Sequence, residues 1–159
     1  MTLQPDLLPL VLLAPLLAAT AWSDIRDLRI PNTLVLAALA LFLVTAPMLT
    51  LGEFGARLVA AAAVFLALFA AFTLRMIGGG DVKMIPALVL FIPSAGLTAF
   101  AFVFSAALLV AVALSLGLQS RLVAGRVGWS ASTARGHMPM GVAIALSGMA
   151  FPLLWTGIA

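Results

Sequence analysis

Long apolar stretches recur along this 159-residue sequence and decide what kind of protein it can form. A helix needs about 20 apolar residues to cross the hydrocarbon core of a bilayer. Hydrophobic residues make up 65% of the chain and charged residues only 8%, which leaves too little polar surface to cover a water-soluble globule. The sequence therefore predicts an integral membrane protein.

Six apolar segments are expected to be the transmembrane helices of an all-α bundle: residues 6–23, 32–50, 57–75, 82–93, 95–118 and 138–157. The fourth is short and carries Pro86 and Pro93, so an alternative joins it to the fifth and gives five spans. The first is not expected to be a cleaved signal peptide, because no Lys or Arg precedes its apolar run. Since the connecting segments are short, we expect one transmembrane domain over residues 1–159.

The basic residues favour six spans and give them an orientation. With six spans, the first, third and fifth loops hold seven Lys and Arg, whereas the second and fourth hold only Arg57. Because Lys and Arg concentrate in cytoplasmic loops, this distribution places the odd-numbered loops in the cytoplasm and both termini outside. Five spans would put the last loop, with three Arg, outside. The net charge of +3 thus indicates topology, and no nucleic-acid partner is expected.

Several polar residues are given structural interpretations. The chain has no Cys and one His, which excludes disulfides, thiolate chemistry and a metal cluster, and no cofactor is expected. His137, which ends a loop over residues 119–137 rich in Gly, Ser and Arg, is expected to be an interfacial or loop residue. Glu53 and Arg57, four residues apart, are expected to form a local pair or a helix start.

Two acids lie between the first two apolar segments, within a cluster of charges that ends at Arg29. Asp27 and its Arg neighbours are equally well explained by a solvated turn, after which Pro31 opens the next helix at its first position. Asp24 directly follows the end of an apolar segment, so we expect it at the membrane edge, facing the bundle. Ionisable groups in such places are costly and usually functional. Asp27 remains the competitor of Asp24.

A third acid follows three consecutive glycines, in the segment Gly78-Gly79-Gly80-Asp81-Val82-Lys83. Glycines cost helical stability but allow backbone conformations and close approaches that side chains forbid. A glycine turn that ends in an acid and a Lys predicts a functional site at Asp81.

The two segments place Asp24 and Asp81 on the same side of the membrane, each beside a helix end. Two carboxylates brought close together cannot both ionise easily, so one keeps a proton while the other acts as a base. Such a pair can activate water to attack a peptide carbonyl and can protonate the leaving nitrogen. It equally suits the relay of a small proton-coupled transporter, so this chemistry alone does not choose. An inactive scaffold subunit would have no use for the glycine turn.

The order of three motifs resembles that of the type IV prepilin peptidases, which are membrane aspartic proteases of the Gly-x-Gly-Asp class. The motifs are Asp24 with Ile30-Pro31-Asn32, Gly78-x-Gly80-Asp81-Val82-Lys83, and Met138-Pro139-x-Gly141-x-Ala143-Ile144-Ala145. The resemblance implies that Asp24 and Asp81 are the catalytic pair. It implies that Gly78 and Gly80 shape the turn that delivers Asp81, and that Lys83 tunes the pair or holds substrate. Pro31 and Asn32 are expected to support the site.

The resemblance also implies a biological role. Members are endopeptidases of the bacterial cytoplasmic membrane that remove the short leader of prepilins or pseudopilins at the cytoplasmic face. The expected partners are thus the substrate helix and the lipid bilayer. Without Cys and with a short first cytoplasmic loop, the chain looks like the peptidase-only form associated with tight-adherence (Flp) pili. No N-methyltransferase activity is therefore expected.

Overall fold

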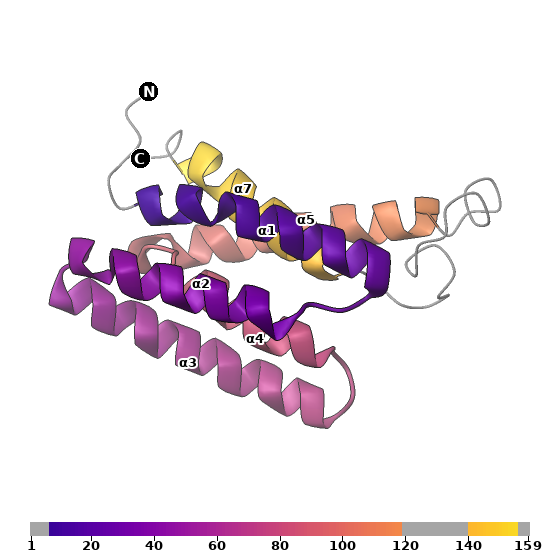
Figure 1. Cartoon of the computed structure of the whole chain (residues 1–159), viewed down its shortest axis with the longest axis horizontal. Helices are drawn as coiled ribbons and strands as arrows, with labels where there is room; N and C mark the ends of the chain where they lie inside the picture. The colour runs from indigo at the N-terminus through magenta and orange to yellow at the C-terminus, as the bar shows by residue number, and fades with distance from the viewer. Residues whose placement is uncertain (1–6, 119–139, 156–159) are drawn as a thin grey trace.

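The computed structural model describes residues 7–118 and 140–155, and in this part of the chain every regular element is helical. The all-α class predicted from the sequence is therefore confirmed. Six α-helices lie side by side along one long direction (Figure 1). They are α1 (Leu8–Asp27), α2 (Asn32–Thr45), α3 (Leu51–Thr73), α4 (Gly79–Val89), α5 (Leu97–Leu118) and α7 (Met140–Trp155). Two 3-10 turns join them: η2 (Ala46–Met48) and η3 (Ser94–Gly96).

Three stretches are long and apolar enough to cross a membrane: α1, α3 and the unit formed by η3 with most of α5. The unit of α2 with η2 and the helix α7 are apolar but shorter. Helix α4 has 11 residues, roughly 16 Å at the rise of an α-helix, about half of a bilayer core. The membrane character of the chain is confirmed, whereas six spans and an outer N-terminus stay predictions.

The helices form two groups of three, one around α7 and the other around α4. On one side α7 packs against α1 and α5, and on the other α4 packs against α2 and α3. Contacts between α4 and α7 and between α1 and α2 join the groups (Figure 1). Helix α4 is buried at almost every position after its first turn, Lys83 excepted. An apolar helix of this kind belongs in the interior of a bundle.

An ion pair between buried Arg57 and half-buried Glu53 fixes the C-terminal end of α4 to the start of α3. Arg57 is 1% exposed, and its Nε donates to Glu53 Oε1 at 2.8 Å, which confirms the predicted local pair. Arg57 Nη1 also donates to the carbonyl oxygen of Leu90 at 3.4 Å. Glu53 in turn accepts from the backbone N–H and the hydroxyl of Ser94, each at 2.7 Å. Because this cluster holds the C-terminal end of α4, it also fixes where the N-terminal end of α4 lies.

Candidate functional site

One face of α1 carries the first acid into the bundle. Leu10, Leu13, Leu17, Thr20 and Asp24 follow one another at intervals of three and four residues, and all are buried. Residues with this spacing share one face of an α-helix. The carboxylate of Asp24 is thus directed into the bundle, and only 6% of the residue is exposed.

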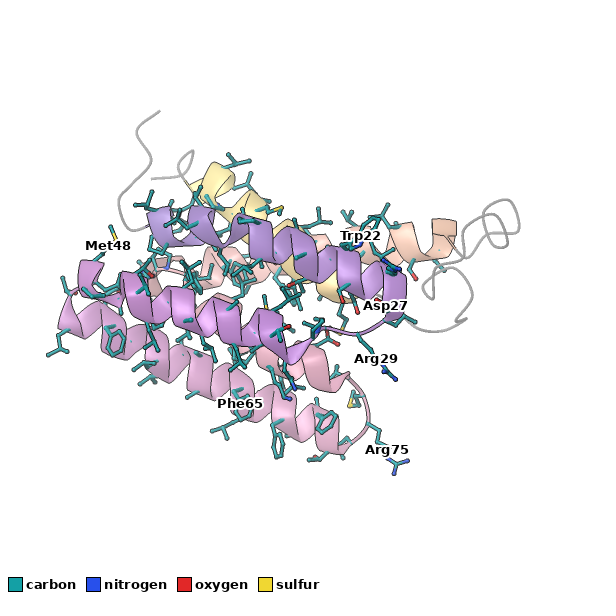
Figure 2. All side chains as sticks on the ribbon, viewed as in Figure 1. Trp22, Asp27, Arg29, Met48, Phe65 and Arg75 are labelled. Atoms are coloured by element: carbon teal, nitrogen blue, oxygen red, sulfur yellow. The ribbon has the colours of Figure 1, made fainter. Side chains whose placement is uncertain are left out.

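The end of α1 differs from the sequence expectation. Asp24 was expected after the end of the helix, but α1 continues through Asp27. It ends where Leu28 takes a left-handed conformation (φ 50°) and donates its N–H to the Asp24 carbonyl oxygen at 2.9 Å. Charged side chains lowered the hydropathy here without interrupting the backbone hydrogen bonds of the helix. Asp27 is exposed and lies at the same end of the bundle as Arg29 and Arg75 (Figure 2).

The N-terminal end of α7 contacts the side chain of Asp24. The backbone N–H of Gly141, the second residue of α7, donates to Asp24 Oδ2 at 2.6 Å. The first N–H groups of a helix have no partner within it and carry positive partial charge, so they suit a carboxylate. A Cβ at position 141 would lie 2.7 Å from the Cβ of Asp24. Gly141 therefore allows α7 to pack closely against Asp24.

The second acid lies in the first turn of α4. Gly78 is the residue before this helix, and its backbone N–H donates a hydrogen bond to the Asp81 carboxylate. A Cβ on Gly78 would lie 2.9 Å from Asp81 Oδ2, and a Cβ on Gly80 would lie 2.9 Å from the Cβ of Ile30. Gly78 therefore leaves room for the carboxylate, and Gly80 leaves room for the segment that joins α1 to α2.

The three glycines were expected to form a turn before the helix, and this part of the prediction was wrong. Gly79, Gly80 and Asp81 form the first helical turn of α4 and not a turn before it. None of the three glycines has a positive φ, so no backbone conformation closed to other residues is involved. Their contribution is close approach alone.

Two adjoining pockets share Asp24, Leu28, Gly78 and Asp81 in their walls. One, of about 480 Å³, is completed by residues 29–32 and by the other glycines of the triplet. The other, of about 810 Å³, reaches past residues 75–77 to α5 and the start of α7. Two acids that are 57 positions apart in the sequence (81 − 24) thus face the same space.

Two neighbouring acids face this space, and the arginines in its walls, Arg29 and Arg75, form no ion pair with either acid. In residues 7–118 and 140–155, no Lys or Arg forms an ion pair with Asp24 or Asp81. Asp81 lies just before the fourth predicted apolar segment and outside the spanning segments. Burial, and secondly the negative charge of Asp24, raise the pKa of Asp81 well above its ordinary value. Among the described residues no group of three potential metal ligands occurs.

The structure also joins two of the expected supporting residues. Lys83 Nζ donates to Asn32 Oδ1 at 3.0 Å, between the first residue of α2 and the second turn of α4. Pro31 precedes α2 as its cap residue and does not occupy the first helical position, yet it lines the smaller pocket as part of the same segment. His137 and the loop over 119–137 lie outside the described residues.

The comparisons with known proteins add one finding. A family model described as the type IV leader peptidase family matches residues 11–116. The matched range contains Asp24, Asp81 and the glycines, and it ends before α7. Comparisons with curated proteins and with solved structures found no match.

Proposed function

The chain belongs to the type IV leader peptidase family, and from this premise we propose that it removes the leader of prepilins or pseudopilins with the carboxylates of Asp24 and Asp81. One observation carries the proposal. Two acids from distant parts of the sequence line the same two pockets, and neither has a cationic partner among the described residues. Acids that merely stabilise a helical bundle would be expected to be paired, as Glu53 is with Arg57.

In the proposed mechanism the two acids share one proton. Asp81 holds it, because burial and the charge of Asp24 favour the protonated form of Asp81. The ionised carboxylate of Asp24 takes a proton from a water molecule, whose oxygen attacks the carbonyl carbon of the scissile peptide bond. When the C–N bond breaks, Asp81 gives its proton to the leaving nitrogen. The reaction consumes one water and needs no metal.

Two backbone amides keep the acids in position. The N–H of Gly141 holds Asp24 Oδ2, and the N–H of Gly78 holds the carboxylate of Asp81. Both donors belong to helix starts, which the packing of α7 and α4 keeps rigid. Catalysis of this kind depends on holding the reacting groups in place before the substrate arrives.

We place the site at the cytoplasmic face of the bacterial inner membrane. The charge distribution of the sequence supports this orientation, because cytoplasmic loops are rich in Lys and Arg. Arg29 and Arg75 are exposed at the end of the bundle where α1 ends (Figure 2). At the opposite end Arg57 is buried and neutralised by Glu53. With the six spans that the charge distribution favours, this orientation places both termini outside.

The test is leader removal from a co-expressed prepilin. Asp24→Asn and Asp81→Asn should each abolish cleavage, because each removes one proton-transfer group. Asp27→Asn is the matched control and should cleave normally, since Asp27 is exposed and lines neither pocket. Full cleavage by both Asp24→Asn and Asp81→Asn would refute the proposal. Proton flux in liposomes that depends on Asp81, without any cleavage, would favour the transporter alternative.

A further inference from the structure

A third hollow in the protein is an apolar groove of about 600 Å³ between α2, α3 and α4. Each helix contributes four residues spaced i, i+3, i+4 and i+7, from Asn32 to Leu39, from Leu58 to Phe65 and from Lys83 to Leu90. Residues with this spacing form one stripe along a helix. Seven residues rise roughly 10 Å, so the groove follows about two helical turns of each wall.

The groove is polar at one end only. Its polar lining residues are Asn32 and Lys83, which form a hydrogen bond at the end where α2 and α4 begin. Asn32 also lines the smaller of the two pockets that contain Asp24 and Asp81, hereafter the dyad pocket. Lys83 lies two residues after Asp81. The groove therefore adjoins the proposed active site, with Asn32 in the wall of both, and its other lining residues apart from Lys83 are apolar.

We propose that this groove binds the apolar membrane helix of the substrate, next to the scissile bond. The inference rests on the proposed function, because it names where that substrate is held. An apolar helix seated on this face buries its side chains against Leu, Phe and Ala. At the Asn32–Lys83 end its chain passes into the dyad pocket. Peptide hydrolysis requires an accessible carbonyl, so the helical part of the substrate ends at this polar pair.

Two other occupants are conceivable for an apolar groove in a membrane, a lipid acyl chain and a second copy of this chain. A lipid whose headgroup bound Lys83 would occupy the junction between the groove and the dyad pocket and would block it. A second copy would fill the groove without using its position next to the pocket of the two acids. The wall that the groove and the smaller pocket share at Asn32 favours the substrate helix.

The first test fills the groove. Ala62 lines the groove on α3, whereas its neighbour Ala63 is also exposed but does not line it. The enzyme is reconstituted in liposomes, and kcat/KM is measured for two substrates. One is a prepilin with its membrane helix, and the other is a short peptide with the same scissile bond but without the helix. The quantity compared between variants is kcat/KM for the prepilin divided by kcat/KM for the short peptide.

Ala62→Trp should lower this ratio roughly tenfold or more, because a side chain forced into occupied space typically costs 1–3 kcal/mol, about 5- to 150-fold. Ala63→Trp should leave the ratio within about twofold of the unsubstituted enzyme. Equal ratios for Ala62→Trp and Ala63→Trp, in an enzyme that cleaves both substrates, would overturn the inference and leave the proposed function intact. An unsubstituted enzyme that cleaves neither substrate would overturn both.

A second test does not depend on how well Ala62→Trp folds. Phe65 is replaced by the photo-crosslinking residue p-benzoylphenylalanine in the Asp81→Asn background, with prepilin co-expressed. Illumination should give an adduct with the mass of enzyme plus prepilin. The same residue at position 63 should give no such adduct. Adducts at position 65 with a second copy or with lipid, and none with prepilin, would overturn the inference.

Discussion

Replacing Gly141 with Ala tests how closely α7 controls the first acid. Gly141 donates its N–H to Asp24 Oδ2 at 2.6 Å. An added Cβ would lie 2.7 Å from Asp24 Cβ and 3.0 Å from both its Cγ and Oδ2. Ordinary contacts begin near 3.4 Å, so restoring one requires Asp24 and the start of α7 to separate by about 3.4 − 2.7 = 0.7 Å. The same movement lengthens or breaks the hydrogen bond that orients the carboxylate.

The expected effect is larger on catalysis than on folding. A displacement of roughly 1 Å at a reacting group can cost about 100-fold in rate. The lost hydrogen bond to a charged group lowers the free energy of unfolding by about 1.5–3 kcal/mol. We therefore expect Gly141→Ala to remain folded at moderate temperature and to cleave prepilin about 100-fold more slowly. Single-turnover cleavage and thermal unfolding in detergent measure the two effects.

Gly148→Ala is the matched control on the same helix. A Cβ at position 148 would lie 2.5 Å from Leu17 Cδ1 and 3.1 Å from Leu88 Cδ1. Gly148 lies two helical turns after Gly141, and no atom of Asp24 or Asp81 is among the near neighbours of this Cβ. It perturbs the packing of α7 against α1 and α4 without touching Asp24, so it should lower stability and spare the cleavage rate. If Gly141→Ala cleaved at the normal rate, or if both variants lost activity equally, the positioning role of Gly141 would be refuted.

Three further predictions follow from the described contacts. Because the pKa of Asp81 is raised, its contribution to stability is greatest at acidic pH and is lost as pH rises through the raised value. Thermal unfolding should therefore show a decline toward alkaline pH that is weaker in Asp81→Asn, and an identical decline would contradict this. Glu53→Ala leaves the guanidinium of Arg57 buried without its carboxylate and should cost about 3 kcal/mol in the free energy of unfolding. Its cleavage rate per folded molecule should change little, and a selective loss of rate would contradict the structural role. Gly80→Ala would place a Cβ 2.9 Å from Ile30 Cβ and should slow cleavage by shifting α4 against the preceding segment. Normal cleavage by Gly80→Ala would show that the close contact between Gly80 and Ile30 is not needed for cleavage.

Much of the architecture followed from features that are local in the sequence. The scarcity of charge predicted a membrane bundle, and the apolar segments marked all six helices to within several residues. The largest error at the site concerned α1, which runs four residues beyond the predicted end at residue 23. Hydropathy measures the preference for lipid, whereas a helix ends where its hydrogen bonds end, here at Leu28. The spacing of Leu17, Thr20 and Asp24 carried the missing signal.

The contacts between distant segments could not be predicted from the sequence. Gly141 and Asp24 are 117 residues apart, and Lys83 and Asn32 are 51 residues apart. Such contacts depend on how whole helices pack against one another. The sequence singled out Gly78 and Gly80 as sites of close approach, but their neighbours, Asp81 itself and Ile30, became visible only in the folded protein.

The central claim is that Asp24 and Asp81 act as one catalytic unit, and a double-mutant cycle tests it most directly. Single-turnover cleavage of prepilin is measured for the unsubstituted enzyme, Asp24→Asn, Asp81→Asn and the double variant. Residues that act as a unit show strongly non-additive losses. We predict that each single variant loses nearly all activity and that the double variant is no slower than the slower single one. Losses that multiply in the double variant, or a normal rate in either single variant, would contradict the shared mechanism.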